Sequence, residues 1–270
     1  MLEAILALGV AGLVFGGVLA LAAQKFKVEE DPRVVEILSV LPGANCGACG
    51  FPGCPGLAAA ISEGKAPCNA CIPGGNAVAG EISEIMGIAS DVIEPRVAVV
   101  YCQGDHDHAV KLADYHGVMD CHALDHLGGL KGCPYGCLGL GSCVRACPFG
   151  AMYMSPQGLP VVIKEKCTGC GACVKACPRY VIDLAPVSKN VHILCRAYDK
   201  GPLVRRYCKV GCIACQVCVR SCPQKAISMD KGTLAKIDYS LCTNCGICAT
   251  KCPVKTIVNE KQAEANKEVS

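Results

Sequence analysis

Two stretches near the C-terminus carry cysteines at a spacing that suits iron–sulfur chemistry. CIACQVCVRSCP begins at Cys212, and CTNCGICATKCP begins at Cys242. Both follow C-x2-C-x2-C-x3-C-P, in which three neighbouring thiolates bind one [4Fe–4S] cluster and the fourth binds another. The two runs therefore predict a two-cluster unit in which each run supplies the last ligand of its partner's cluster.

A second pair of runs lies upstream. CTGCGACVKACP begins at Cys167 and is regular, whereas CPYGCLGLGSCVRACP begins at Cys133 and has Leu140 at the second ligand position. Cys133 is the expected substitute ligand. One constant shift in residue number aligns the upstream pair of runs with the downstream pair. This shift aligns Cys137 with Cys212, and it also aligns Cys133 with Cys208. This agreement indicates an internal duplication, and we call the shift the duplication offset.

Four ligand sets follow from exchange of the last cysteine within each pair of runs. They are Cys133, Cys137, Cys143 and Cys177; Cys167, Cys170, Cys173 and Cys147; Cys212, Cys215, Cys218 and Cys252; and Cys242, Cys245, Cys248 and Cys222.

A further cluster is expected near the N-terminus, in LPGANCGACGFPGCPG. Cys46, Cys49 and Cys54 lie close together there, and Cys71 is the expected fourth ligand, with Cys68 as the alternative. The interspersed glycines let the backbone turn tightly and point its amides at a bound cluster. The sequence therefore predicts five [4Fe–4S] clusters.

Composition supports bound metal over other uses of cysteine. The 270 residues include 25 cysteines and no tryptophan. An odd count clustered in threes argues against disulfides, and triplets closed by Cys-Pro favour iron–sulfur over zinc, whose ligands come as separated pairs. The net charge of +3 offers no evidence for nucleic acid. We find no dinucleotide fingerprint, P-loop or nucleophile–base pair, so no catalytic residue is expected.

The N-terminus predicts a membrane anchor over residues 1–24. No charge interrupts Ala4–Ala23, a length that matches a bilayer core. A cleaved signal peptide is the alternative, but Glu3 precedes the apolar run and no basic residue does. Lys25 and Lys27 follow it, which places the C-terminal bulk in the cytoplasm.

The expected fold is α+β: an N-terminal transmembrane helix, a small mainly helical [4Fe–4S] domain and two tandem ferredoxin-like units. A helix is expected to begin at Asp31-Pro32, another to span 76–89, and VAVV at 97–100 to form a buried strand. The predicted parts are 1–24 (anchor), 25–90 (helical cluster domain), 91–130 (connecting segment), 131–192 and 193–258 (ferredoxin-like units) and 259–270 (polar tail).

The connecting segment is harder to interpret. Five of the six histidines lie within 106–126, near Cys102 and Cys121. Histidine with cysteine can bind a transition metal, but the spacing fits no metal motif and also suits packing or docking. Cys121, Cys195 and Cys208 have no assigned partner, and a sixth cluster drawn from such residues is the open alternative.

The order of these modules resembles the B subunit of Rnf complexes, which are membrane-bound ferredoxin:NAD+ oxidoreductases. The resemblance covers nearly the whole chain and rests on the N-terminal span, on NCGACGFPGC with its distant fourth cysteine, and on the tandem ferredoxin units. It places Cys46, Cys49, Cys54 and Cys71 at the N-terminal cluster of the family. The sequence departs from the regular ferredoxin run at Leu140, and this departure affects the ligands of one cluster.

The resemblance implies an electron-transfer subunit in the inner (cytoplasmic) membrane. Reduced ferredoxin would be the donor, membrane and flavin- or NADH-binding subunits the acceptors, and Na+ or H+ the ion transported. Rival interpretations are a subunit that keeps a redox-sensing transcription factor reduced, a polyferredoxin wiring another membrane redox enzyme, and a methyl-transfer protein. The last would need a cobalamin domain, for which the chain has no room.

Overall fold

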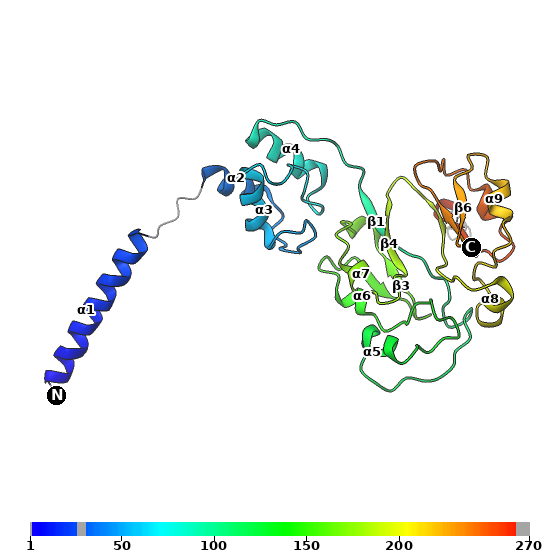
Figure 1. Ribbon diagram of the computed structural model, residues 1–270, viewed down its shortest axis with the longest axis horizontal. Coiled ribbons are helices and arrows are strands. Elements are labelled where there is room, and N and C mark those ends of the chain that lie inside the picture. The colour runs from blue at the N-terminus through cyan, green and yellow to red at the C-terminus, as the bar shows by residue number, and fades with distance from the viewer. Residues whose placement is uncertain (1, 26–30, 263–270) are drawn as a thin grey trace.

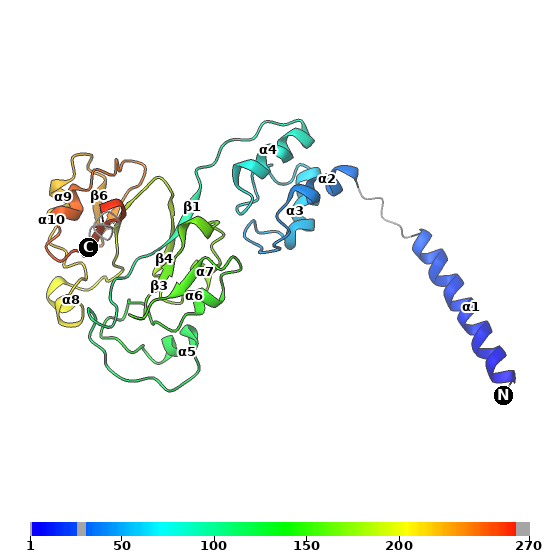
Figure 2. The ribbon, with the colours of Figure 1, turned by 180° about the vertical axis from the view of Figure 1, so that it is seen from behind.

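The computed structural model describes residues 2–25 and 31–262. In Figure 1, helix α1 (Leu2–Lys25) extends away from a small helical domain, which is followed by two α+β units. Figure 2 shows the same order along the long axis from behind. Residues 1, 26–30 and 263–270 lie outside the described part, so most of the predicted polar tail, 259–270, is not addressed.

Helix α1 covers almost all of the predicted membrane anchor. Its large described apolar side chains are exposed, including Leu13 at 80% and Phe15 at 69%. Over residues 2–25 and 31–262, no helix combines the length and the apolarity that a bilayer span requires. The anchor over residues 1–24 stays a prediction.

Three helices build the small domain: α2 (Pro32–Val40), α3 (Gly53–Ser62) and α4 (Gly75–Met86). The Asp31 carboxylate caps α2 by accepting a hydrogen bond from the Arg33 backbone N–H at 2.9 Å. This confirms the helix start predicted at Asp31-Pro32, and α4 confirms the helix predicted within 76–89. The apolar faces meet in a core that includes Ile37, Leu57, Ile61 and Ile82.

The first α+β unit has two antiparallel strand pairs. Strand β1 (Arg96–Val100) pairs with β4 (Ile182–Pro186), and β2 (Met152–Met154) pairs with β3 (Pro160–Val162). The short helices of this unit are α6 (Ser142–Arg145), η1 (Lys164–Lys166) and α7 (Ala172–Lys175). Strand β1 confirms the buried strand expected at 97–100; it lies in the predicted connecting segment, yet pairs within the first unit.

The second α+β unit repeats this plan. Strand β5 (Val191–Ile193) pairs with β8 (Ile257–Asn259), and β6 (Ile227–Asp230) pairs with β7 (Leu234–Ile237). Its helices are α8 (Gly201–Tyr207), α9 (Val217–Ser221) and α10 (Ile247–Lys251). The pairs of hairpin-like strands and short helices agree with the predicted ferredoxin-like arrangement.

Strand register shows which parts of the two units correspond. Val100 lies opposite Ile182 in the first unit, and Ile193 lies opposite Ile257 in the second. Because the duplication offset carries Ile182 onto Ile257, β5 is the counterpart of β1. The connection after that strand is longer in the first unit, 101–132 against 194–207, and it contains α5 (Cys121–His126).

Each cluster-binding run ends in a very short helix that starts from a left-handed residue. Gly141, Gly171 and Gly246 precede α6, α7 and α10 with φ of 73°, 76° and 74°, and Gln216 precedes α9 with φ of 59°. Glycine adopts this conformation without a Cβ penalty. The left-handed residue makes a turn that lets the loop with the earlier cysteines fold back toward the helix that carries the third cysteine.

Candidate metal centres

The cysteines converge in groups of four, which we call sites A to F. Site A lies in the helical domain, sites B and C in the first α+β unit, sites D and E in the second, and site F between the two units. Their members are Cys46, Cys49, Cys54 and Cys71 (A); Cys121, Cys137, Cys143 and Cys177 (B); Cys147, Cys167, Cys170 and Cys173 (C); Cys212, Cys215, Cys218 and Cys252 (D); Cys222, Cys242, Cys245 and Cys248 (E); and Cys102, Cys133, Cys195 and Cys208 (F).

Sites B, C and D each line a cavity. The hollows measure about 340, 310 and 360 Å3 respectively, with their open mouths included. Apolar side chains complete the walls, such as Val181 at site B, Leu184 at site C and Ile257 at site D. Sites C and D therefore have the membership that ligand exchange between paired runs predicts.

Sites A and E each contain one buried thiol whose pKa is raised by burial and by three neighbouring cysteines. Burial raises the pKa of Cys71, and the charges of Cys54, Cys49 and Cys46 raise it further. At site E, burial and then the charges of Cys242, Cys245 and Cys222 raise the pKa of Cys248 to about 11. These two groups also contain the cysteines that the sequence predicts.

The chemistry of the donors fits an iron–sulfur cluster. All 25 cysteines lie in the described part of the chain and are free thiols. Burial raises the pKa of Cys143 and Cys218 to about 11 and of Cys173 to about 12, and neighbouring thiolates add to the effect. Four thiolates in one hollow are poorly solvated and repel one another. Iron in a bound cluster would supply the compensating positive charge and keep the thiols deprotonated.

Backbone amides point at several sulfurs. The Ala151 and Ala98 N–H groups donate to the Sγ atoms of Cys147 and Cys167, at 3.3 and 3.4 Å. The donor from Ala98 belongs to β1, so this strand contributes to site C directly. Hydrogen bonds to the sulfurs stabilise negative charge and thereby influence the reduction potential of a bound cluster.

Site B differs from the sequence expectation at one position. The sequence places Cys133 with Cys137, Cys143 and Cys177, but the structure has Cys121 lining that cavity and Cys133 in site F. Leu140, at the second ligand position of the run, packs with Cys121 in one buried apolar cluster. Cys121 comes from the long connection at 101–132, so its spacing from the run does not identify it as a member of site B. The one hint in the sequence is that Cys121 has no other assigned partner.

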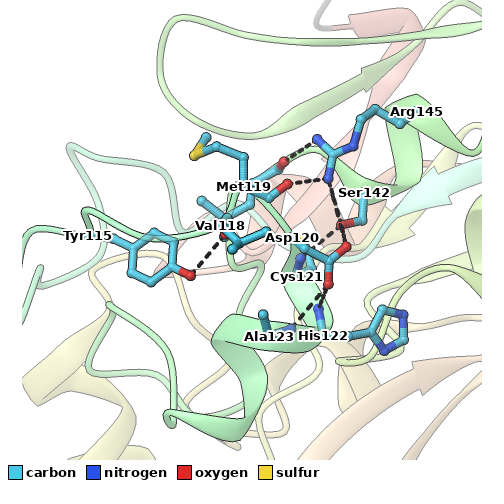
Figure 3. A network of polar contacts seen from close by, with 10 residues as sticks. Tyr115, Val118, Met119, Asp120, Cys121, His122, Ala123, Ser142 and Arg145 are labelled. Atoms are coloured by element: carbon cyan, nitrogen blue, oxygen red, sulfur yellow. Dashed lines mark hydrogen bonds and ion pairs between the residues drawn. The ribbon is translucent and has the colours of Figure 1, made fainter.

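A polar network fastens Cys121 beside α6 (Figure 3). The Cys121 backbone N–H donates to Ser142 Oγ at 2.8 Å, and Ser142 Oγ donates to Asp120 Oδ2 at 3.0 Å. Asp120 Oδ1 caps α5 by accepting from the N–H groups of His122 and Ala123, at 2.9 and 3.1 Å. Because Ser142 immediately precedes Cys143, the network joins two members of site B.

Arg145 closes the network from the other end of α6. Its Nη1 donates to the carbonyl oxygen of Leu140 at 2.9 Å, and its Nη2 donates to Ser142 Oγ at 3.1 Å and to the carbonyl oxygen of Met119. The loop at Leu140 and the segment before Cys121 are thus bound by the same guanidinium. Figure 3 shows Arg145 beside Met119 and Ser142.

The loop of site A is held by Asn45. Its Oδ1 accepts a hydrogen bond from the Cys54 backbone N–H at 2.7 Å. Gly53 has φ of 76°, and a Cβ there would approach Asn45 Oδ1 to 2.7 Å, so the loop needs glycine at this position. Cys68 is buried in the core of the helical domain together with Cys71. Of the two candidates, Cys71 is the one shown close to Cys46, Cys49 and Cys54.

Two of the histidines within 106–126 make local hydrogen bonds that involve no cysteine. His108 Nδ1 lies 2.6 Å from Asp105 Oδ1, and the N–H of His122 is bound to the cap of α5. Within the described ranges, no three or more His, Cys, Asp or Glu side chains have the geometry of a single-ion site.

Three family models match the chain in the order of its parts. Residues 41–73 match the family described as "Putative Fe-S cluster". Residues 131–182 and 211–256 match two families that are each described as "4Fe-4S dicluster domain". These ranges contain site A and the runs of sites B to E, so the families support [4Fe–4S] clusters in both α+β units.

The chain is also similar to characterised proteins over most of its length. It is 48% identical to the B subunit of the Na(+)-translocating ferredoxin:NAD(+) oxidoreductase complex of Acetobacterium woodii, over 90% of this chain and 74% of the relative. It is 46% identical to the B subunit of the ion-translocating oxidoreductase complex of Methanosarcina acetivorans, over 86% and 88%. It is 49% identical to the B subunit of the proton-translocating ferredoxin:NAD(+) oxidoreductase complex of Clostridium ljungdahlii, over 86% and 82%.

Proposed function

Because the chain belongs to the family of B subunits of Rnf-type ion-translocating ferredoxin:NAD+ oxidoreductases, we propose that it carries electrons from reduced ferredoxin to flavin-containing partner subunits. The observation that carries this proposal is the similarity, at 46–49% identity, over 86–90% of the chain. Bound clusters supply one-electron chemistry, and the chain holds, shields and tunes them.

For the ligands, we propose that sites A to E each hold one [4Fe–4S] cluster. Four sets are those expected from the sequence, and site B takes Cys121 in place of Cys133. Support for Cys121 comes from its place on the wall of the cavity with Cys137, Cys143 and Cys177. The network through Ser142 also fixes its backbone beside α6.

We also propose that residues 1–24 attach the chain to the cytoplasmic membrane, with the cluster domains on the cytoplasmic side. The uncharged run Ala4–Ala23 and the two lysines that follow it support this orientation. Removal of residues 1–24 is expected to release the chain from membranes that lack the other subunits. Retention of the shortened chain there would contradict the proposal.

Electron entry is tested with the full chain purified without oxygen. Chemically reduced ferredoxin is mixed with the oxidised protein, and bleaching of the cluster absorbance is followed together with the EPR signals of reduced clusters. We expect electrons to move from ferredoxin to the chain, and membranes that lack this subunit to lose ferredoxin-dependent NAD+ reduction until it is restored. Unchanged NAD+ reduction in those membranes would show that the assignment is wrong.

A further inference from the structure

Charge is distributed unevenly along the chain, although the whole carries only +3. Residues 25–130 contain six Lys and Arg against 14 Asp and Glu, a net charge of −8. Residues 131–192 have a net charge of +5, and residues 193–258 have +8, with 11 Lys and Arg against three Asp and Glu. The second α+β unit is therefore the most positive part of the molecule, and its field draws negatively charged partners toward it.

The second unit also brings its sulfurs closest to the solvent. All 25 cysteines lie in the described part of the chain, and two of them are exposed, Cys215 of site D and Cys245 of site E. Their counterparts by the duplication offset are Leu140, which is buried, and Cys170, which is half-buried. In Figures 1 and 2 the second unit lies at the opposite end of the molecule from α1. A carrier in solution can therefore approach the sulfurs of this unit most closely.

Apolar side chains flank one of the two exposed sulfurs. Leu241 and Ile247 lie on either side of Cys245 along the chain, and they are 51% and 39% exposed. Among the described residues, the loop of site D at 211–219 contains no large apolar side chain that is exposed to this degree. A small apolar centre within a polar rim is typical of the contact between two protein partners. Site E is therefore the better placed of the two for docking.

Lysines lie near the ligands of site E. Lys189 Nζ donates to the Cys242 carbonyl oxygen at 2.6 Å. The N–H of Lys225 donates to the Cys222 carbonyl oxygen at 3.2 Å, and Lys251 ends α10, the helix that begins next to Gly246. The side chains of Lys225 and Lys251 are exposed. These positive charges favour an approaching anion and also the arrival of an electron at the site.

We propose that the exposed side chains of Cys245, Leu241, Ile247, Lys225 and Lys251, here called the entry surface, dock a small electron-carrier protein with acidic residues around its redox centre. This inference rests on the proposed function, in which reduced ferredoxin is the donor, and adds the place where the donor docks. One electron passes from the carrier to the cluster of site E: the carrier is oxidised, the cluster is reduced, and no bond or proton changes place.

The first unit provides an internal comparison, because it has the same cluster-binding plan and a different surface. The duplication offset matches the apolar and lysine positions of the entry surface with other residues, namely Lys166 for Leu241, Ala172 for Ile247, Gly150 for Lys225 and Ala176 for Lys251. Site C, the counterpart of site E, keeps all four of its cysteines. The entry surface is thus not needed to hold a cluster, which supports a role in contact with a partner.

The test measures the second-order rate at which an acidic ferredoxin reduces the full chain, purified without oxygen, over a range of salt concentrations. Lys225→Glu with Lys251→Glu should slow the reaction on the order of tenfold at low salt and flatten its salt dependence, because electrostatic steering is lost. Lys166→Glu with Lys175→Glu makes the same charge change at exposed residues of the first unit and is the matched control. It should slow the reaction only about twofold, since the charges lie away from the entry surface.

Two single variants separate apolar contact from charge. Leu241→Lys copies the residue of the first unit and should weaken binding of the carrier roughly three- to tenfold without flattening the salt dependence. Asp238→Asn removes a negative charge close to Cys242, whose N–H donates to the Asp238 carbonyl oxygen at 3.1 Å. It should speed the reaction about twofold at low salt. Iron content, and reduction by a small viologen radical that needs no docking, should be unchanged in every variant.

The outcomes distinguish the inference from the proposed function. Equal slowing by the two charge-reversed pairs, or no slowing by Lys225→Glu with Lys251→Glu, would overturn the entry surface and leave the proposed function intact. A pair that keeps its rate with ferredoxin but no longer copurifies with the partner subunits would assign the surface to a fixed subunit, which also overturns the inference.

Loss of iron from the charge-reversed pair would pass the decision to Leu241→Lys, and an unchanged rate in that variant would overturn the inference. A native chain that ferredoxin does not reduce at all would reject the proposed function itself.

Discussion

The first and second α+β units share strands, helices and two cluster sites, yet they fill one position of those sites differently. Cys215 occupies the second position of its run in the second unit, and Leu140 occupies it in the first. The backbone around that position is nevertheless alike. Arg145 donates to the Leu140 carbonyl at 2.9 Å, and Arg220, its counterpart, donates to the Cys215 carbonyl at 3.4 Å.

The conformation of the loop therefore does not depend on its carrying a ligand. The first unit keeps the loop and obtains a sulfur from the long connection at 101–132, where Cys121 begins α5. That connection must then be fixed to the run. Ser142 provides the attachment, and its counterpart in the second unit is Val217, which has no comparable task because Cys215 is already part of its run.

The largest effect on iron content is expected from removing Cys121 in the first unit or Cys215 in the second. Cys121→Ala and Cys215→Ala should each lose one cluster, about four irons per chain, because three thiolates and water hold a cluster poorly. Leu140→Cys added to Cys121→Ala should restore the lost irons, since Leu140 packs against Cys121 beside the cavity. Iron and sulfide analysis with EPR checks both steps.

The control is to add Leu140→Cys to Cys133→Ala and to compare the iron content with that of the Cys121→Ala pair. If Cys121 serves site B, restoration by Leu140→Cys should follow the loss of Cys121 and not the loss of Cys133. Restoration of the irons lost in Cys133→Ala would return Cys133 to site B and remove the contrast between the two units.

A smaller effect is expected from the attachment at Ser142. Ser142→Val leaves the buried N–H of Cys121 without its acceptor, which costs about 1–3 kcal/mol. Iron release from site B to a chelator should then be roughly 5- to 140-fold faster, because each ~1.4 kcal/mol corresponds to a factor of ten. Val217→Ala is the matched change in the second unit, and an equal acceleration there would contradict a special role for Ser142.

The paired arginines should differ less. Arg145→Gln removes donors to the carbonyls of Leu140 and Met119, at a cost of about 0.5–1.5 kcal/mol for a partly exposed group. Arg220→Gln removes one long contact and should cost under about 0.5 kcal/mol. Chelator-driven iron release from the two variants measures both. A larger effect at Arg220 would mean that the loop of the second unit depends more on its arginine.

The smallest effect concerns acid. The Ala123 N–H, followed by the Ser142 hydroxyl, lowers the pKa of the Asp120 carboxyl below its usual value. Its stabilising contribution is therefore complete above about pH 4, the value in an unfolded chain, and is lost as pH falls through the lower folded pKa. Relative to Asp120→Asn, the native protein should lose its advantage in retaining iron at site B as the pH drops below about 4. A constant ratio of the two release rates across that range would contradict the effect.

Much of the fold was predictable because its signals are local. The cap at Asp31, the helix within 76–89 and the strand at 97–100 each follow from neighbouring residues, and the structure confirms them. The sequence did not reveal that β1 belongs to the first unit. That assignment depends on hydrogen bonds between Arg96–Val100 and Ile182–Pro186, segments far apart along the chain.

Some members of the cysteine groups could likewise be predicted from local sequence, and others could not. Membership of sites C, D and E follows from short spacing and from ligand exchange between adjacent runs, which are sequence rules. Cys121 could be noted only as unassigned, because nothing in its neighbourhood specifies a cluster. Cys102 and Cys195 were left over for the same reason, although the duplication had already related Cys133 to Cys208.

The cluster-binding runs, the duplication and the family could be recognised from residue types and their spacing along the chain. The distant sulfurs that complete the groups became known from the three-dimensional arrangement. Pairing of β1 with β4 and of β5 with β8 brings Cys102 and Cys195 to equivalent places, and the network of Ser142 brings Cys121 to site B. Spacing along the chain is insufficient for these sulfurs because a cluster needs sulfurs that converge in space, whatever their separation in the chain.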